Sequence, residues 1–264
     1  MPAQHGLLRQ LEAVAALQRR LLPRQIPQPP GWRFAVHYAV GPRPGGDYYD
    51  FLPLPDGRLL LFIADASDEG APSAVLVAIV RVVLHACPLS SGTDCLPFCP
   101  LRGEVVQPPH LILGHLNRVL AENCLNGQSM TAFCGLLSPA EGTLHYANAG
   151  HLPARLWRAA TGTVESLPDA PGLPLALEPH TSYHHKRSCL EPGDMLVLYS
   201  DGLTACHDAR GALFGTGRLD AVIRQLAPGG AEKVKAGLLA NLESFLGREQ
   251  AQDDLTLLVF GRQA

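Results

Sequence analysis

Hydrophobic positions along the chain recur in patterns that predict its strands. Residues 32–39 alternate between apolar and polar positions, which is typical of a strand with one buried face. Residues 45–70 contain two apolar runs separated by Pro55-Asp56-Gly57. Because proline presets a negative φ and glycine adopts a positive one, we expect two strands joined by a tight turn. Further strands are predicted at 131–137, 143–148, 154–157, 195–199 and 255–260.

Apolar residues at helical spacing predict helices in the main part of the chain. One covers residues 71–86, where Pro72 is tolerated in the first turn. Others are expected at 111–122, 218–226 and 231–246. Connections of hairpin length dominate, so the sheets should be mainly antiparallel. The pattern therefore predicts an α+β fold in which two antiparallel sheets pack face to face, with helices outside.

An apolar stripe with spacings of four and three runs through residues 7–22 and predicts a helix, although Gln18 interrupts the stripe at one inward position. The prolines between 23 and 30 end this helix. Two interpretations stand equal: the helix packs on its own domain, or it forms a dimer or partner contact. We divide the chain into an N-terminal helix with a proline-rich linker at 1–30 and a main domain at 31–264.

Residues 87–109 break the pattern with prolines and cysteines and are expected to form a surface insertion. A zinc site built from the three cysteines of this segment with His85 or His110 is the less favoured alternative, because the spacing matches no standard pairing. The pair His184-His185 is expected at a solvated edge, since a strand directs adjacent side chains to opposite faces.

Composition and charge narrow the classes of partner. The chain has 264 residues, 47% of them hydrophobic, and a net charge of −3 with scattered lysines and arginines. Nucleic acid is therefore not an expected partner, because phosphate binding needs clustered basic charge. The longest apolar runs are far short of the ~20 residues that span a membrane. Without an apolar signal region at the N-terminus, and with seven cysteines but no CxxC motif, we expect a cytoplasmic protein with reduced thiols.

Two acids mark the ends of the predicted hairpin at 45–70. Asp47 opens its first strand and Asp65 closes its second, and each lies nine residues from Asp56 in the turn. A hairpin brings such positions side by side, so the two carboxylates should be neighbours. Neighbouring buried carboxylates repel each other unless a proton or a cation lies between them. We favour the cation.

Two further acids lie in matching contexts. Asp201 follows the apolar run at 195–199, and Asp253 precedes the run at 255–260. Each acid taken alone is explained as a turn residue or a solvated strand end. All four together favour a metal site at one edge of the sandwich. Ligands that are all oxygen favour Mg²⁺ or Mn²⁺ over Zn²⁺.

The motifs GGDYYDF, DASDEG, ANAGHLP, LYSDGLT and QDDLTLLVF occur in this order along the chain. Together they resemble the PPM-type metal-dependent serine/threonine phosphatases, in particular their SpoIIE/RsbU-like bacterial branch. The resemblance extends from about Gln18 to Phe260, and only the insertion at 87–109 falls outside it. It implies a four-layer αββα sandwich with a centre of two Mn²⁺ or Mg²⁺ ions at one edge.

The resemblance also implies a role for each acid. Asp65 would bridge the two metals, and the carbonyl of Ala66 would bind one of them. Asp201 and Asp253 would hold the other ion, and Asp47 would bind a metal or its water. Asp254 would support the site. The Gly150-His151 turn would lie near it, with no role that the sequence assigns.

The implied activity is hydrolysis of phosphoserine or phosphothreonine by a metal-bridging hydroxide, without a phosphoenzyme. Metals would reverse the charge of the acids and so admit a phosphate dianion. In the resembling branch the usual substrate is a small phosphorylated anti-anti-sigma factor of a partner-switching pathway. Two alternatives stay open. Asp68, Glu69 and the insertion motivate a catalytically silent metal- or partner-binding module of the same fold, and the third possibility is a hydrolase of small phosphoesters.

Overall fold

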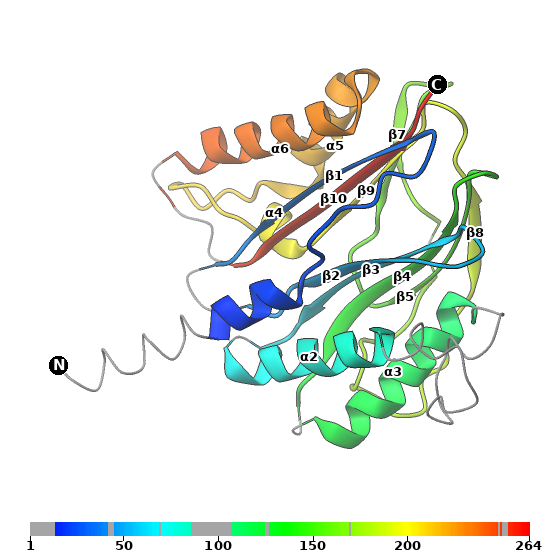
Figure 1. The fold of residues 1–264 in the computed structure, drawn as a ribbon. Helices are drawn as coiled ribbons and strands as arrows, with labels where there is room; N and C mark the ends of the chain where they lie inside the picture. The colour runs from blue at the N-terminus through cyan, green and yellow to red at the C-terminus, as the bar shows by residue number, and fades with distance from the viewer. Residues whose placement is uncertain are drawn as a thin grey trace.

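The structure is a computed structural model that describes residues 14–41, 45–68, 70–85, 107–124, 127–168, 170–247, 249 and 253–264. It contains two five-stranded sheets packed face to face, with helices on both outer faces (Figure 1). All strand pairs within these sheets are antiparallel. The predicted αββα sandwich is confirmed.

The first sheet joins the two ends of the domain, because the first and the last strand pair with each other. Its order is β1 (Trp32–Ala39), β10 (Leu255–Arg262), β9 (Met195–Tyr199), β6 (Arg155–Arg158) and β7 (Thr163–Ser166). The second sheet follows the chain more simply. Its order is β2 (Tyr48–Pro53), β3 (Leu59–Ala66), β4 (Met130–Ser138), β5 (Thr143–Ala149) and β8 (Lys186–Cys189).

Two pairs of helices cover the outer faces of the sheets (Figure 1). Helices α2 (Ala71–His85) and α3 (Pro109–Asn123) pack on the second sheet and share a buried cluster with it. Helices α5 (Gly215–Leu226) and α6 (Ala231–Leu246) cover the first sheet in the same way. Shorter helical segments are α4 (Asp201–Thr204), the 3₁₀ turn η1 (Ala227–Gly229) and residues 14–21. None of the helices in the described ranges is long and apolar enough to cross a membrane.

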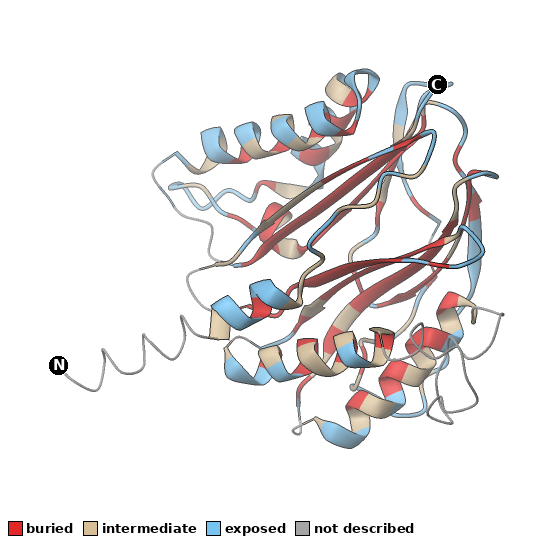
Figure 2. Ribbon diagram, viewed as in Figure 1, coloured by how far each residue is buried: buried red, intermediate tan, exposed pale blue. Residues whose placement is uncertain are grey.

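Aromatic side chains fill the space between the two sheets, where Figure 2 shows the strands as buried. The ring of Phe34 stacks on Phe260 of the same sheet with centroids 5.0 Å apart, and it meets Phe51 of the opposite sheet edge-on at 5.7 Å. Buried aromatic pairs of this kind add to the stabilisation that burial of apolar area provides. The sheets are therefore held in a fixed relation to each other, and so are the loops at their edges.

The expected hairpin forms with the expected turn. Strands β2 and β3 pair from Tyr48 opposite Ala64 to Pro53 opposite Leu59. Gly57 has a φ of 82° and donates its N–H to the carbonyl of Leu54 at 3.0 Å. One further step of the same register places Asp47 opposite Asp65.

The structure adds elements that the sequence pattern did not predict. Strands β7 and β8 are short and mostly exposed, so they lack the apolar alternation that identifies a strand. Helix α3 begins at Pro109, two residues before its predicted start, because proline is well placed in a first helical turn. Asp201 starts the short helix α4, where only the end of a strand was expected.

The expected insertion and its cysteines at 87, 95 and 99 lie outside the described residues except at 107–109. His85 instead lies 2.5 Å from the carboxylate of Asp50. His185 is exposed, as expected for an edge, and its Nε2 lies 2.8 Å from Nδ1 of His145. The N-terminal helix is present over residues 14–21, and its first half lies outside the described ranges.

Two leucines of different burial test the packing between the sheets. Leu61 on β3 is fully buried there, whereas Leu213 is 51% exposed. We expect Leu61→Ala to lower the free energy of unfolding by about 2–5 kcal/mol, because it leaves a cavity. Leu213→Ala should change it by less than about 0.5 kcal/mol. Urea denaturation of both variants measures the difference, and equal losses would contradict the assigned core.

Candidate functional site

The four predicted acids reach one region from four strands of the two sheets. Asp47 directly precedes β2, and Asp65 is the penultimate residue of β3. Asp201 begins α4 just beyond β9, and Asp253 lies two residues before β10. Because β9 and β10 are paired antiparallel neighbours, the end of one lies beside the start of the other. The fold thus places two acids at the strand ends of each sheet.

Asp47 is buried and connects the two sheets. The hydroxyl of Thr256 on β10 donates to Oδ2 of Asp47 at 2.5 Å. Burial raises the pKa of Asp47, and the nearby charge of Asp65 raises it further, while hydrogen bonds from Thr256 and Ser200 act in the opposite direction. The register of β2 and β3, which pairs Tyr48 with Ala64, bears out the predicted hairpin geometry, because the next step places Asp47 opposite Asp65.

The other acids repel one another as well. Burial raises the pKa of Asp65 to about 7, with further contributions from the charges of Asp201, Asp253 and Asp254. The pKa of Asp201 is raised by burial and then by Asp253, although the backbone of Gly202 opposes this. None of the ion pairs in the described part of the chain involves Asp47, Asp65, Asp201 or Asp253.

Asp254 organises the backbone around these acids. Its Oδ1 accepts a hydrogen bond from the N–H of Gly41 at 2.8 Å, and its own N–H donates to Oδ1 of Asp253 at 2.8 Å. A Cβ on Gly45 would lie 2.0 Å from the Asp254 carboxyl group, so only glycine fits there. The next residue, Gly46, packs equally closely on Ala66. Glycine at positions 45 and 46 allows the backbone to approach this closely, and the supporting role of Asp254 stays a prediction that the packing favours.

Three polar residues near the acids were not predicted as part of the site. The backbone N–H of Ser200 donates to the carbonyl of Thr256 at 3.0 Å, and the hydroxyl of Ser200 accepts from the N–H of Thr256 at 2.9 Å. The buried side chain of Gln18 donates to the carbonyl of Gly45 at 2.5 Å. For Gln18 the sequence held a signal, since a polar residue interrupts the inward face of an apolar helix. Thr256 and Ser200 carried no such signal, because both suit ordinary strand ends.

Nucleophilic side chains near the acids form hydrogen bonds with backbone groups. The hydroxyl of Ser67 accepts a hydrogen bond from the N–H of Ser129 at 3.0 Å, which joins the segment after β3 to the segment before β4. The thiol of Cys206 is buried and donates to the carbonyl of Gly202 at 2.8 Å. Burial raises the pKa of Cys134, which keeps that thiol protonated.

The donor set fits a hard divalent cation in its chemistry. The acids supply only oxygen ligands and carry uncompensated negative charge, which a cation would neutralise. Among the described residues, no three histidine, cysteine, aspartate or glutamate side chains are grouped closely enough to enclose an ion. Mg²⁺ commonly binds through one or two carboxylates and keeps several waters, so such a cage is not required.

The cavities lie beside the acids rather than around them. A cavity of about 240 Å³ between β1 and α6 has Asp253 in its wall. A larger one of about 800 Å³ lies on the outer surface, between residues 14–21 and helices α2 and α3. It contains none of the predicted metal ligands, so we do not assign it to the chemistry.

Comparison with known proteins identifies the family. The model of the family "Stage II sporulation protein E (SpoIIE)" matches residues 55–263. The chain is 28% identical to the phosphoserine phosphatase RsbU of Bacillus subtilis, over 98% of this chain and 72% of RsbU.

Solved structures share the fold. The SiaA-PP2C domain of Pseudomonas aeruginosa matches with a TM-score of 0.76 at 21% identity. The match covers 98% of this chain and 98% of that domain. The RsbU and RsbW domains of Rv1364c from Mycobacterium tuberculosis give a TM-score of 0.72 at 24% identity. That match covers 93% of this chain and 64% of the other, so the chain spans less than two thirds of that larger protein.

Repulsion among the acids predicts a stabilising substitution in metal-free protein. Asp65→Asn should raise the free energy of unfolding at pH 8 by roughly 2–4 kcal/mol, since one pKa unit corresponds to about 1.4 kcal/mol. The pKa of Asp65 is raised from 3.8 to about 7 in the folded chain. The folded state therefore binds the proton more tightly, and the wild type gains stability as the pH falls from 7 towards 4. The difference in free energy of unfolding between Asp65→Asn and the wild type should therefore decrease from pH 7 to pH 4.

Urea denaturation in the presence of a chelator, at pH 8 and pH 5, measures this effect. Asp56→Asn is the matched control, because Arg58 lowers the pKa of that exposed turn residue. The control should give no gain at pH 8. An Asp65→Asn variant as stable as the wild type at both pH values would show that the fold does not raise the pKa of Asp65.

Proposed function

Because the chain belongs to the SpoIIE family, we propose that it is a metal-dependent phosphatase of a small phosphorylated regulatory protein. Membership rests on the match over residues 55–263, and together with the likeness to RsbU it makes the chain a serine/threonine protein phosphatase. The metal mechanism and the substrate are the parts that we propose. The observation that carries the mechanism is the convergence of four aspartates at neighbouring strand ends, with no ion-pair partner among the described residues. The pKa values of Asp47, Asp65 and Asp201 are raised there.

The ligand assignment follows from the position of each acid. Asp65 and the carbonyl of Ala66 would hold one ion, Asp201 and Asp253 the other, with Asp65 shared and Asp47 on a metal or its water. Two Mn²⁺ or Mg²⁺ ions, when bound, supply the positive charge for a phosphate dianion and acidify a water for in-line attack on phosphorus. The engaged states of Ser67 and Cys206 support a mechanism without a covalent phosphoenzyme.

The residues around the acids orient them for this role. The hydroxyl of Thr256 donates to Oδ2 of Asp47 and so fixes the orientation of this carboxylate. Asp254 holds the backbone at Gly41 and packs on Gly45, so the segment that carries Asp47 is fixed at two points. Such orientation matters because a catalytic group displaced by about 1 Å can lose on the order of 100-fold in rate.

The substrate we propose is a phosphoserine or phosphothreonine on a small anti-anti-sigma-factor protein. RsbU is named a phosphoserine phosphatase, which supports phosphoserine as the group that is hydrolysed. A cytoplasmic location accords with such a substrate and stays a prediction. The rival function, a catalytically silent module, is favoured by one observation: Asp68 is exposed three residues beyond Asp65 and adds negative charge.

Loss of one acid separates the two functions. We expect Mn²⁺- or Mg²⁺-dependent release of phosphate from a phosphorylated anti-anti-sigma factor, and a loss of at least about 100-fold in kcat for Asp201→Asn. Asp56→Asn, in the exposed turn of the hairpin, should keep wild-type activity. Metal binding by calorimetry without any turnover would instead support the silent module, and turnover only on small phosphoesters would support the third interpretation.

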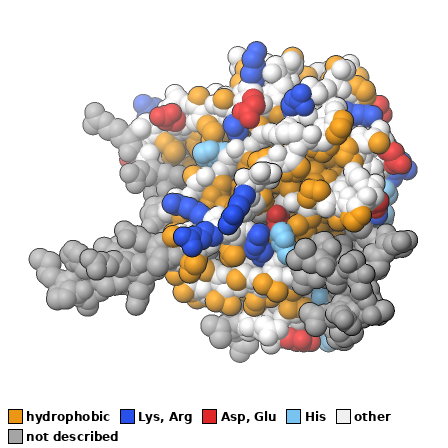
Figure 3. All heavy atoms as spheres, viewed as in Figure 1, with side chains coloured by type: hydrophobic (Ala, Val, Ile, Leu, Met, Phe, Trp, Pro, Cys, Tyr) orange, Lys and Arg blue, Asp and Glu red, His pale blue; other side chains and the backbone are white. Residues whose placement is uncertain are grey.

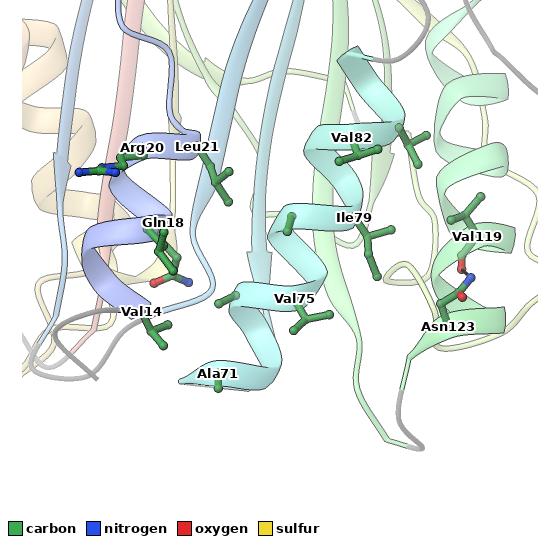
Figure 4. Close-up of a pocket in the computed structure, with 14 residues that line it drawn as sticks. Val14, Gln18, Arg20, Leu21, Ala71, Val75, Ile79, Val82, Val119 and Asn123 are labelled. Carbon is green, nitrogen blue, oxygen red and sulfur yellow. Dashed lines mark hydrogen bonds between the residues drawn. The ribbon is translucent and has the colours of Figure 1, made fainter. Parts of the chain in front are cut away.

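We further propose that the N-terminal helix forms a contact between two copies of the chain. The outer cavity is lined mainly by apolar side chains of residues 14–21 and α2, with α3 on its far side (Figure 4). Leu17, Val75 and Val82 there are 61%, 57% and 64% exposed. Hydrophobic side chains gather over α2 in the space-filling view, next to Lys and Arg side chains (Figure 3). An apolar surface of this kind is typical of an interaction site.

A charge placed in this surface tests the contact. Leu17→Lys should weaken self-association at least about 10-fold, because the ammonium group would lose its hydration in the interface. Leu213→Lys, at an equally exposed leucine away from the cavity, should leave it unchanged. Light scattering over a range of concentrations measures the dimer. A wild type that stays monomeric throughout would exclude the contact.

A further inference from the structure

The turn Gly150-His151 follows β5 and takes no part in the proposed mechanism. Gly150 has a φ of 71°, and the ring of Pro174 would lie 3.0 Å from a Cβ at this position. The side chain of Asn148 then clamps the next residue. Its amide nitrogen donates to the carbonyl of His151 at 2.9 Å, and its oxygen accepts from the N–H of His151 at 2.7 Å. The backbone therefore fixes where the imidazole lies.

The imidazole of His151 is buried and reaches the strand of Asp65 through one hydroxyl. Its Nδ1 lies 2.9 Å from Oγ1 of Thr131. The hydroxyl of Thr131 donates to the backbone carbonyl of Asp65 at 3.4 Å. Thr131 stands directly opposite Asp65 in the register of β3 and β4. The peptide group between Asp65 and Ala66 is thus the end of a chain of contacts that starts at the imidazole.

The imidazole is held through one of its two nitrogens. Burial lowers the pKa of His151 to about 4, so the ring is neutral near pH 7. Its Nε2 has no hydrogen-bond partner among the described residues, so Nδ1 and the hydroxyl of Thr131 make the contact that holds the ring.

The hydrogen atoms can be placed from these contacts. The ring is neutral near pH 7, so only one of its nitrogens carries a hydrogen. The single hydroxyl hydrogen of Thr131 goes to the carbonyl of Asp65. The hydroxyl oxygen must then accept a hydrogen from Nδ1 of His151, since two acceptors cannot bond to each other.

We propose that His151 is a positioning residue of the phosphatase site, which holds the Asp65–Ala66 peptide in place through the hydroxyl of Thr131. The inference rests on the proposed function, because Asp65 and the carbonyl of Ala66 are the ligands that it positions. It concerns residues that touch neither the metal nor the substrate. Partners of this kind typically change metal affinity or activity 10- to 100-fold when removed.

Two substitutions remove the chain of contacts at different points. His151→Leu removes the donor, and Thr131→Val removes the hydroxyl with little change in shape. Each should lower kcat about 10- to 100-fold and leave KM for the phosphoprotein within about twofold, because the buried ring does not reach the substrate. The double variant should lose no more than either single variant, since both act through one chain of contacts.

Three further variants and one measurement separate positioning from general stability. His151→Asn should restore much of the activity, because its amide nitrogen lies where Nδ1 does. His151→Gln, which places its amide further out, should not. Thr143→Val, at the opposite end of β5, should behave as wild type. In metal-free protein, hydrogen exchange at the N–H of Ala66, which donates to Gly46 at 3.3 Å, should speed up at least about 10-fold in His151→Leu and Thr131→Val only.

The exchange measurement keeps this inference separate from the proposed function. If the wild type hydrolyses no phosphoprotein, the proposed function fails, and exchange at Ala66 still decides the role of His151. If His151→Leu does not fold, Thr131→Val decides alone. Wild-type kcat with unchanged exchange in a folded variant would overturn the inference, and so would additive losses in the double variant.

Discussion

Mutual repulsion of carboxylates at the junction of the two sheets is the constraint on which the site depends. Burial raises the pKa of Asp47 and of Asp65; the charge of Asp65 raises the pKa of Asp47 further, and the charges of Asp201, Asp253 and Asp254 raise that of Asp65. Such a cluster opposes folding, because each ionised carboxylate loses hydration without gaining a cation. The aromatic core between the sheets must outweigh this cost. Strain of this kind is common where a site is arranged for a ligand rather than for stability.

The position of the acids on strands explains how the cluster stays together. Strand ends of a packed sandwich cannot separate without breaking the pairing of Asp65 with Thr131 or of β10 with β9. Close packing removes the remaining freedom. A side chain on Gly202 would lie 1.9 Å from the carbonyl of Asp254, and Gly45 meets the carboxyl group of the same residue. The geometry of the site is therefore a property of the backbone more than of side-chain choice.

The sequence predicted the parts of this arrangement that depend on residues close together along the chain. Distances along the hairpin placed Asp47 beside Asp65, and apolar runs located β9 and β10 next to Asp201 and Asp253. The edge strands β7 and β8 escaped prediction, because exposed edges need no apolar alternation. Contacts between the two sheets were not predicted from the sequence either. The bond from Thr256 to Asp47 joins residues 209 positions apart, and no local pattern reports such a pairing.

Protons and metal ions compete for the same excess of negative charge. Burial, and then the charges of neighbouring acids, raise the pKa of Asp65 to about 7, and a divalent cation would offset both effects, so one cluster sets the affinity for protons and for metal. Because a carboxylate must be ionised to act as a ligand, metal affinity should rise with pH through the neutral range. Bound metal would in turn stabilise the fold by mass action, in proportion to the logarithm of its concentration over its dissociation constant. The acids thus couple folding, protonation and metal binding, and the neutral His151 beside them leaves that balance of charge undisturbed.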